Sequence, residues 1–232
     1  GYYEQWLEIT RETGDRRGAA YAATNVAALL ADAGELERAR TRLSEALATF
    51  RETGAVWGLA YRRSEPAVYA AAYHKRGLTY GPDGPGAVYR IDLTTGDVDL
   101  FVTVPDAGDQ RRGPSFARGL RDDDADAGRF VGKTALGDID LDADEKEVFV
   151  VNLASRRIYR YEMPSGTLLG SFDHGAAAEP WSREARPFGL AFHAGHLHQG
   201  VVNEQGNGDE FVGVIYRSEP DGSAMPAVAV LD

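Results

Sequence analysis

The chain contains no cysteine among its 232 residues, which excludes disulfide bonds, thiolate metal sites and a cysteine nucleophile. No apolar run approaches the roughly 20 residues that span a bilayer as a helix. Positive charge is also scarce, because 25 lysine and arginine residues stand against 36 aspartate and glutamate residues, for a formal net charge of −11. Since such a surface repels phosphate backbones, we expect no nucleic-acid partner. The absence of a long apolar run leads us to expect no membrane span.

Proline is absent between residues 2 and 55, where alanine, leucine, glutamate and arginine dominate. Apolar residues recur there at helical spacing, for example at Leu36, Leu43 and Leu47. Gly34 separates two such runs and suits a left-handed turn between antiparallel helices. The pattern predicts helices over about residues 2–13, 17–33 and 35–53.

The stretch "NVAALLADAGELERARTRLSEAL" at Asn25–Leu47 resembles the tetratricopeptide (TPR) repeat, with Ala27, Ala39 and Ala46 at the positions where paired helices need small residues. The resemblance implies a helical hairpin over residues 1–55. It also implies a binding surface for a protein or peptide, and it favours the cytoplasm.

After Ala55 the spacing of apolar residues changes from a period of 3.6 residues to a period of about 2 residues. Short runs rich in β-branched and aromatic residues alternate with turn clusters, in three passes of four predicted strands. The third strands of the passes read "VYRID", "IYRYE" and "IYRSE" and begin at Val88, Ile158 and Ile215. Strand alternation places Val88 and Ile158 on one face and Tyr89 and Tyr159 on the other.

The opening strands of the three passes carry Gly58, Gly137 and Gly189, which we align as matching points. Repeated four-stranded units resemble β-propeller blades. The segment "RPFGLAFHAGHL" is similar in sequence to propeller regions of large bacterial secreted or surface proteins. The resemblance implies blades at about 56–105, 135–175 and 186–232, with a long insertion at 106–134.

The predicted fold class is therefore α+β in separate segments, a TPR-like helical hairpin followed by an incomplete antiparallel β-propeller-like region of about three blades. Propellers close with four to eight blades. We therefore expect either a fragment of a larger bacterial protein or self-association through open sheet edges.

Two acidic stretches are candidate sites. Asp122, Asp124 and Asp126 alternate in "RDDDADAGR", as in a calcium loop, so Ca²⁺ is the one cofactor considered. Lys133 stands where an EF-hand has its closing glutamate, so a solvated loop is the alternative. In "DIDLDADEKE", which begins at Asp138, we expect the carboxylates to alternate outward from a strand.

The histidines form the next group. "FHAGHLHQG" places His193, His196 and His198 within six residues, and His196 and His198 share a strand face, which permits joint metal ligation. A hairpin turn at "HAGH" is the alternative. His74 in "YHKRG" lies next to basic residues and either faces a ligand or ends a strand.

The insertion at 106–134 combines arginines with phenylalanines, and loops of that length are often functional. We expect Arg112, Phe116 and Arg118 to bind an anionic or glycan ligand together with His74 and Arg76. A crossover that covers the end of a blade is the alternative.

No nucleophile elbow, phosphate loop or dinucleotide fingerprint occurs in the sequence. The first hypothesis is therefore a non-enzymatic protein–protein interaction or scaffold module. The alternative is a ligand- or glycan-binding protein, or a metal-dependent enzyme, that uses the propeller mouth with His74, His193 and Asp138. The blades favour a secreted or cell-surface protein and the helices favour the cytoplasm, so the compartment stays open.

Overall fold

The computed structural model describes residues 55–76, 78–109, 127–203 and 212–231. These residues form three four-stranded sheets. The first sheet contains β1 (Val56–Arg62), β2 (Ala67–Ala72), β3 (Ala87–Asp92) and β4 (Val98–Thr103). The second contains β5 (Leu136–Leu141), β6 (Glu147–Asn152), β7 (Arg157–Glu162) and β8 (Leu168–Asp173). The third contains β9 (Ala185–His193), β10 (His196–Asn203), β11 (Gly213–Ser218) and β12 (Ala227–Leu231).

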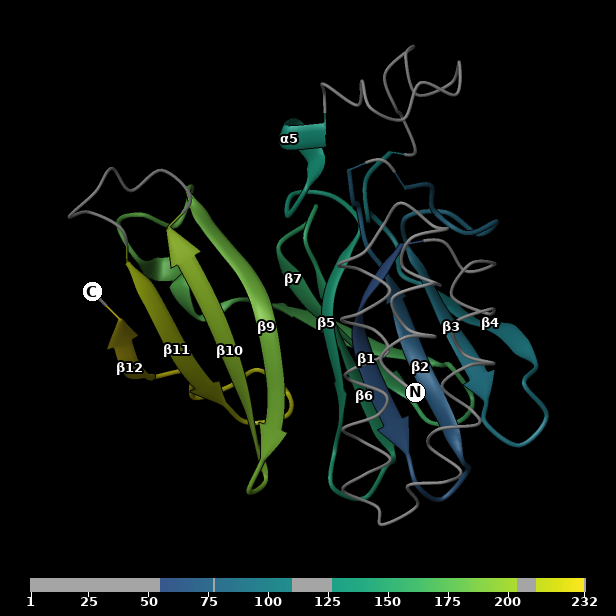
Figure 1. Ribbon diagram of the computed structural model, residues 1–232. Helices are drawn as coiled ribbons and strands as arrows, with labels where there is room; N and C mark the ends of the chain where they lie inside the picture. Colours follow the sequence, from purple (N-terminus) through teal and green to yellow (C-terminus); the bar gives the residue numbers. More distant parts are fainter. Residues whose placement is uncertain (1–54, 77, 110–126, 204–211, 232) are drawn as a thin grey trace, which may run out of the picture.

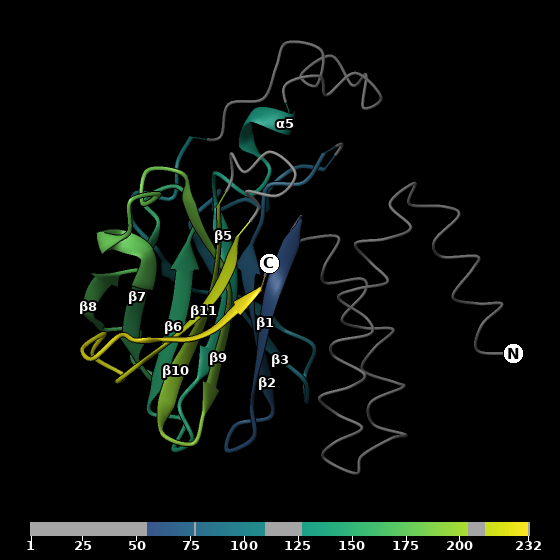
Figure 2. The ribbon, with the colours of Figure 1, turned by 90° about the vertical axis from the view of Figure 1, so that its left-hand side faces the viewer.

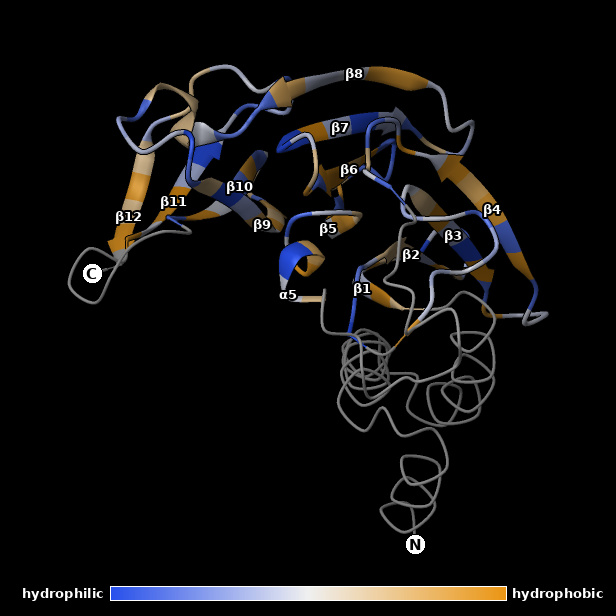
Figure 3. Ribbon diagram, turned by 90° about the horizontal axis from the view of Figure 1, so that it is seen from above, coloured by the Kyte–Doolittle hydropathy of each residue, from blue (hydrophilic) through white to orange (hydrophobic). Residues whose placement is uncertain are grey.

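Each sheet is a meander in which every strand pairs antiparallel with the one before it. Seen from above, the three sheets spread like a fan, with β1, β5 and β9 on the inside and β4, β8 and β12 on the outside (Figure 3). Stacked four-stranded meanders around a common inner side are the architecture of propeller blades. The described part of the chain therefore has a β-propeller-like fold.

The core lies between the sheets. Tyr69, Ala71 and Val88 of the first sheet pack against residues of β5, β6 and β7 of the second. Phe149 and Ile158, on the opposite face of the second sheet, pack with residues of β9 and β10. Burying one large apolar side chain contributes about 1.5–3 kcal/mol, so these two layers supply most of the apolar stabilisation of the described fold.

The predicted alternation in the third strands is confirmed. Val88 packs between the first and second sheets, while Tyr89 belongs to a cluster with Ala72 and Ala87. In β7, Ile158 faces the third sheet and Tyr159 faces the first.

The predicted α+β class is wrong for the described residues, which are nearly all β. Their helical segments are the single turn α5 (Ala127–Phe130) and the 3-10 turn η2 (Gly175–Ala178) (Figure 1). The physical reason is that the apolar strand faces cover one another, so this core needs no helix. Except for Ala55, the predicted TPR-like hairpin at 1–55 lies outside the described residues, as do residues 110–126 of the predicted insertion. The division into domains at residue 55 stays a prediction.

The strand registers correct the alignment of the opening strands. Leu59, Ile139 and Leu190 hold equivalent places, because they pair with the matching residues Ala70, Val150 and Gln199 of the second strands. The residues just before them are therefore equivalent, and these are Gly58, Asp138 and Gly189. The prediction that Gly137 matches the other two glycines is wrong by one residue, because the sequence "GD" offers a glycine one place too early.

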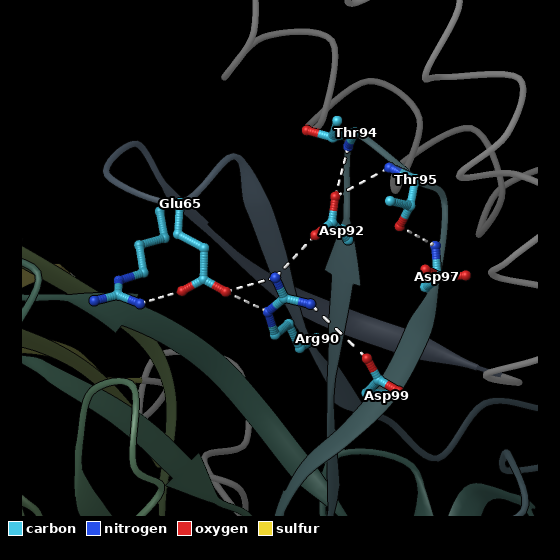
Figure 4. A network of polar contacts seen from close by, with 8 residues as sticks. Glu65, Arg90, Asp92, Thr94, Thr95, Asp97 and Asp99 are labelled. Carbon is cyan, nitrogen blue, oxygen red and sulfur yellow. Dashed lines mark hydrogen bonds and ion pairs between the residues drawn. The ribbon is translucent and has the colours of Figure 1, made fainter.

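A polar network ties the turns of the first sheet to its strands (Figure 4). The guanidinium of Arg90 on β3 donates to Glu65 at 2.5 Å and to Asp92 at 3.0 Å, and it lies 3.8 Å from Asp99 on β4. Glu65 also accepts from Arg62 at the end of β1. One guanidinium therefore holds together the β1–β2 turn, β3 and β4.

The second sheet repeats this arrangement in a simpler form. Arg160 occupies the place of Arg90 in the third strand and makes a bidentate contact with Glu147, with nitrogen–oxygen distances of 2.8–3.0 Å. Arg217 holds the same place in β11 and is exposed. The third sheet thus keeps the arginine, but the contacts of the described residues give it no carboxylate partner.

The inner strands approach most closely at Gly58. A Cβ added there would lie 2.6 Å from the carbonyl oxygen of Gly137 and 2.8 Å from Cα of Asp138, whereas a Cβ added at Gly189 would meet nothing within 4 Å. We expect Gly58→Ala to lower the free energy of unfolding by about 1–3 kcal/mol, because backbone atoms of β5 must move. The matched control Gly189→Ala should change it by less than about 0.5 kcal/mol. Urea unfolding in dilute solution measures both, and equal effects would contradict the close approach of β1 and β5.

Candidate functional site

A pocket of about 490 Å³ opens where the three inner strands end. Tyr61 and Arg63 come from the end of β1, residues 140–143 and Glu145 from β5 and its turn, and residues 192–194 from the β9–β10 hairpin. The meanders explain this meeting, because each sheet starts on the inner side and the three inner strands run in the same direction. The volume falls within the range of about 300–1,000 Å³ that is usual for small-molecule sites.

Two aspartates of β5 reach across to β9. Asp138 accepts the N–H of Leu190 at 3.1 Å, and Asp140 accepts the N–H of Phe192 at 2.7 Å. With its other oxygen, each carboxylate accepts the N–H of the residue that follows it, at 3.1 Å and 2.8 Å. Two carboxylates thereby satisfy four backbone donors of the inner strands.

These aspartates are half-buried and reach toward β9, so the prediction that they point outward is wrong. Burial raises the pKa of both carboxyls, although the hydrogen bonds from the backbone act in the opposite direction. The first sheet has Gly58 and Ala60 at the equivalent positions, which is why β1 lies directly against β5. Asp138 and Asp140 instead fill the space between β5 and β9 with carboxylates.

Glu145 joins the turns of the first two sheets. Its carboxylate accepts the backbone N–H groups of Arg63 at 3.0 Å and Ser64 at 2.9 Å, and it lies 3.4 Å from the Arg63 guanidinium. Burial alone would raise the pKa of Glu145, but the hydrogen bonds from Ser64 and Arg63 outweigh it and lower the pKa to about 2. Glu145 is therefore an ionised clamp on one wall of the pocket.

The β9–β10 turn explains why the pocket stays open. Residues 142–146 connect β5 to β6, whereas only Ala194 and Gly195 connect β9 to β10. Both turn residues have positive φ, at 50° and 82°, as in a type I′ hairpin. This short turn has no long side chain with which to reach the β5–β6 turn in the way that Glu145 reaches the β1–β2 turn.

The lining combines different chemistries. Asp142 accepts the N–H groups of Lys146 and Glu147 through Oδ1, at 2.6 Å and 2.9 Å, while no described contact uses its Oδ2. Arg63, whose side chain is 74% exposed, and His193, which is also exposed, add donors. Phe192 adds aromatic surface. The pocket thus offers an acceptor, donors and a ring within one small volume.

His74 lies away from this pocket. It follows β2, which runs antiparallel to β1, so it lies near the start of β1 and not its end. The side chain is 1% exposed, its Nδ1 lies 2.5 Å from Oη of Tyr80, and its ring lies 5.4 Å from that of Phe130. Arg76 is exposed nearby. The other predicted ligand residues, Arg112, Phe116 and Arg118, lie outside the described residues, so the structure does not test that set.

Of the predicted metal ligands, the histidines are among the described residues and the three aspartates are not. His196 on β10 lies 3.4 Å from Glu219 and contacts the carbonyl oxygen of Ala194 at 3.0 Å. The rings of His193 and His198 are 6.3 Å apart. Asp122, Asp124 and Asp126 lie outside the described residues. Among the residues that are described, no group of three or more histidines, aspartates or glutamates is arranged to hold a metal ion.

The sequence indicated some of the pocket residues but not the pocket. His193 was a candidate, and Asp140, Asp142 and Glu145 lie in the candidate stretch "DIDLDADEKE", whereas Tyr61 and Arg63 were not predicted. A signal was present, because the ends of the first strand in each pass must meet once the passes are stacked as blades. The two-residue length of the β9–β10 turn, against longer turns in the other sheets, would have marked the opening.

Comparison with known proteins gives partial likenesses. No family model matches the chain. It is 29% identical over 165 residues to Colossin-A and 26% identical over 188 residues to Colossin-D, both of Dictyostelium discoideum. These alignments cover 67% and 78% of the chain but only 2% and 20% of the relatives, so the chain spans a small part of either protein.

Solved structures give weaker likenesses. A nidogen/laminin complex matches 77% of the chain and 49% of its own chain, with 16% identity and a TM-score of 0.45. An aldose sugar dehydrogenase from Streptomyces coelicolor matches 72% and 45%, with 18% identity and a TM-score of 0.42. Regucalcin from Agrobacterium tumefaciens matches 75% and 43%, with 10% identity and a TM-score of 0.42. The propeller-like assignment rests on the sheet topology.

In the described part of the chain, no helix is long and apolar enough to cross a membrane.

The Glu145 clamp predicts a pH-dependent loss of stability. We expect Glu145→Gln to lower the free energy of unfolding by about 1–2 kcal/mol at pH 7, because an amide replaces the carboxylate that accepts two N–H groups. The pKa of Glu145 in the folded chain, about 2, lies below the ordinary value of 4.5. Its contribution is therefore present above about pH 4.5 and is lost as the pH falls toward 2.

Urea unfolding between pH 3 and pH 7 measures the difference between wild type and variant, which should shrink toward the acidic end. Glu162→Gln is the matched control, because Glu162 is an exposed residue of β7 that accepts from the hydroxyl of Ser165. A difference independent of pH would show that the charge of Glu145 has no part in the clamp.

Proposed function

We propose that the protein is a non-catalytic binding module that takes a sugar or another hydroxyl-rich ligand in the pocket at the ends of β1, β5 and β9. The observation that carries the proposal is the mixed lining of this pocket. Hydroxyl groups both donate and accept hydrogen bonds. Asp142 can accept from them, and Arg63 and His193 can donate to them.

An aromatic residue supports the same ligand class. Phe192 lines the pocket from the end of β9, on the side of that strand that packs against the second sheet. Phe192 is braced from behind, because its ring stacks on that of Phe149 with the centroids 5.8 Å apart and an interplanar angle of 15°. A supported ring offers a flat apolar surface for the carbon–hydrogen face of a sugar.

The state of the carboxylates favours binding over catalysis. Both oxygens of Asp140 accept backbone N–H groups, and the carboxylate of Glu145 holds the β1–β2 turn. Using either group to transfer a proton would break contacts that hold the sheets together. The described lining also contains no serine, threonine or lysine nucleophile.

The other hypotheses have less support. The TPR scaffold rested on residues 1–55, nearly all outside the described part, and no family model matches. The metal-dependent enzyme needed His74, His193 and Asp138 to act together. Of these, only His193 lines the pocket. His74 lies near the opposite end of the first sheet, and both oxygens of Asp138 accept backbone N–H groups of β5 and β9.

The proposal predicts sugar binding that depends on pocket residues. Titration calorimetry with a panel of neutral mono- and disaccharides should give at least one ligand with a Kd below about 1 mM. Arg63→Ala and His193→Ala should each raise that Kd about tenfold, by removing an exposed donor without disturbing the core. Leu169→Ala, at a residue of β8 that is 45% exposed and far from the pocket, is the control and should leave the Kd unchanged. If no saccharide binds, or if both variants bind like the wild type, the proposal is wrong.

A further inference from the structure

The third sheet has one face that no described sheet covers. Leu197 and Gln199 of β10 are buried on the side of the second sheet, so their neighbours His198 and Gly200 lie on the opposite face. We call this opposite face of the third sheet the open face, and Figure 2 views the molecule from the side of the third sheet. Along β10 the residues of the open face alternate with buried residues and are partly exposed.

The open face carries basic side chains. Residues that lie directly opposite each other on neighbouring strands point to the same face of a sheet. His198 of β10, for example, lies opposite Arg217 of β11. The basic residues that the pairing of β9, β10 and β11 sets on the open face are Arg186, Arg217, His193, His196 and His198.

The strands of this sheet contain no aspartate or glutamate, although the chain has a formal net charge of −11. Glu219, the residue after β11, contacts one of the histidines, with 3.4 Å between its Oε1 and Nε2 of His196. Two arginines against this one glutamate leave the described groups named here with a positive charge. The open face is therefore opposite in sign to the chain as a whole, and it attracts negative charge locally.

Arginines at the place of Arg217 bind carboxylates of this chain in the other two sheets. Arg90 of β3 donates to Glu65 at 2.5 Å, and Arg160 of β7 makes its bidentate contact with Glu147. In the third sheet the described contacts give this place no carboxylate, and Arg217 lies opposite a histidine. A guanidinium and an imidazole on one face can donate to the same anionic group. A carboxylate from a partner would therefore complete in the third sheet what Glu65 and Glu147 complete in the other two.

The inner part of the open face leaves room for a polypeptide backbone. β1 reads "WGLAY" and β9 reads "FGLAF", so Gly189 has the place of Gly58. Beside Gly58 the backbone of β5 lies so close that an added Cβ would be 2.6 Å from the carbonyl oxygen of Gly137. Beside Gly189 no described atom lies within 4 Å of an added Cβ, and its partner on β10 is another glycine, Gly200. An extended segment can therefore lie on β9 as β5 lies on β1.

We propose that the open face binds an extended acidic segment of a partner protein, and that one carboxylate of this segment pairs with Arg217 beside His198. A protein segment fits better than a nucleic acid, because the net charge of −11 repels a continuous row of phosphates. A segment with a few carboxylates experiences less of this repulsion and still meets the local positive charge. The surface is separate from the proposed sugar pocket, although His193 borders both.

Fluorescence anisotropy with a labelled synthetic peptide tests the proposal on the whole chain. The probe is a peptide of about 12 residues in which glutamate and threonine alternate, so that its carboxylates share one face when the peptide is extended. We expect a Kd below about 100 µM in about 20 mM salt and weaker binding in about 300 mM salt. A peptide with glutamine in place of glutamate should not bind, because it has no charge to pair with Arg217.

Variants of the chain locate the contact. Arg217→Gln should raise the Kd at least about tenfold, because it removes the guanidinium from an exposed position. Ala191→Glu should have a similar effect, because it puts a carboxylate opposite His198 at another exposed position. Arg157→Gln is the control of equal charge, because Arg157 pairs with Asp173 in the second sheet, and this variant should leave the Kd unchanged. Circular dichroism confirms that each variant is folded.

Several results would overturn the proposal. The acidic peptide could fail to bind at chain concentrations up to about 1 mM, or the glutamine peptide could bind equally well. Binding could also be unchanged in Arg217→Gln and Ala191→Glu, or it could weaken as much in Arg157→Gln, which would make it an effect of net charge. A single-stranded oligonucleotide of similar length is the second probe. If it binds more tightly than the peptide and loses affinity in Arg217→Gln, the open face is a nucleic-acid surface and the proposal is wrong.

Discussion

The distance between neighbouring inner strands determines the rest of this fold. Where β1 meets β5, a glycine lets backbone lie directly against backbone, and the first two sheets close tightly. Where β5 meets β9, two aspartate side chains stand between the strands. The same four-stranded unit is thus stacked at two different spacings, and the pocket lies at the end of the wider one.

The wider spacing is stabilised by unusual means. Inner strands of a stacked-sheet fold expose backbone N–H groups that no further strand can satisfy. In the second sheet, Asp138 and Asp140 each satisfy one such group on β9 and one on β5. Burial of a carboxylate is unfavourable without partners, so two N–H donors for each charge are what make this arrangement tolerable.

The three four-stranded passes were predictable from the sequence, because period-two alternation and turn clusters are local signals. The repeated "YR" of the third strands also placed Val88 and Ile158 on the correct face. The alignment of the opening strands was not predictable, since bulges shift the register and the pair Gly137–Asp138 misplaced the glycine. Asp138 and Asp140 alternate as surface residues do. Their burial depends on the third sheet, which a pattern within one strand cannot reveal. The pocket was missed for a related reason, because its walls come from three turns that lie far apart in the chain.

The two-residue turn between β9 and β10 affects the pocket but not the core. Its residues contribute nothing to the layers between the sheets, so its length is free to vary without cost to folding. If two or three residues with one acidic side chain were inserted in this turn, the new carboxylate could accept backbone N–H groups of the β5–β6 turn, as Glu145 does for the β1–β2 turn. Such a contact would close the pocket. The length of this turn therefore controls whether the pocket is open, whereas the residues that line the pocket determine its chemistry.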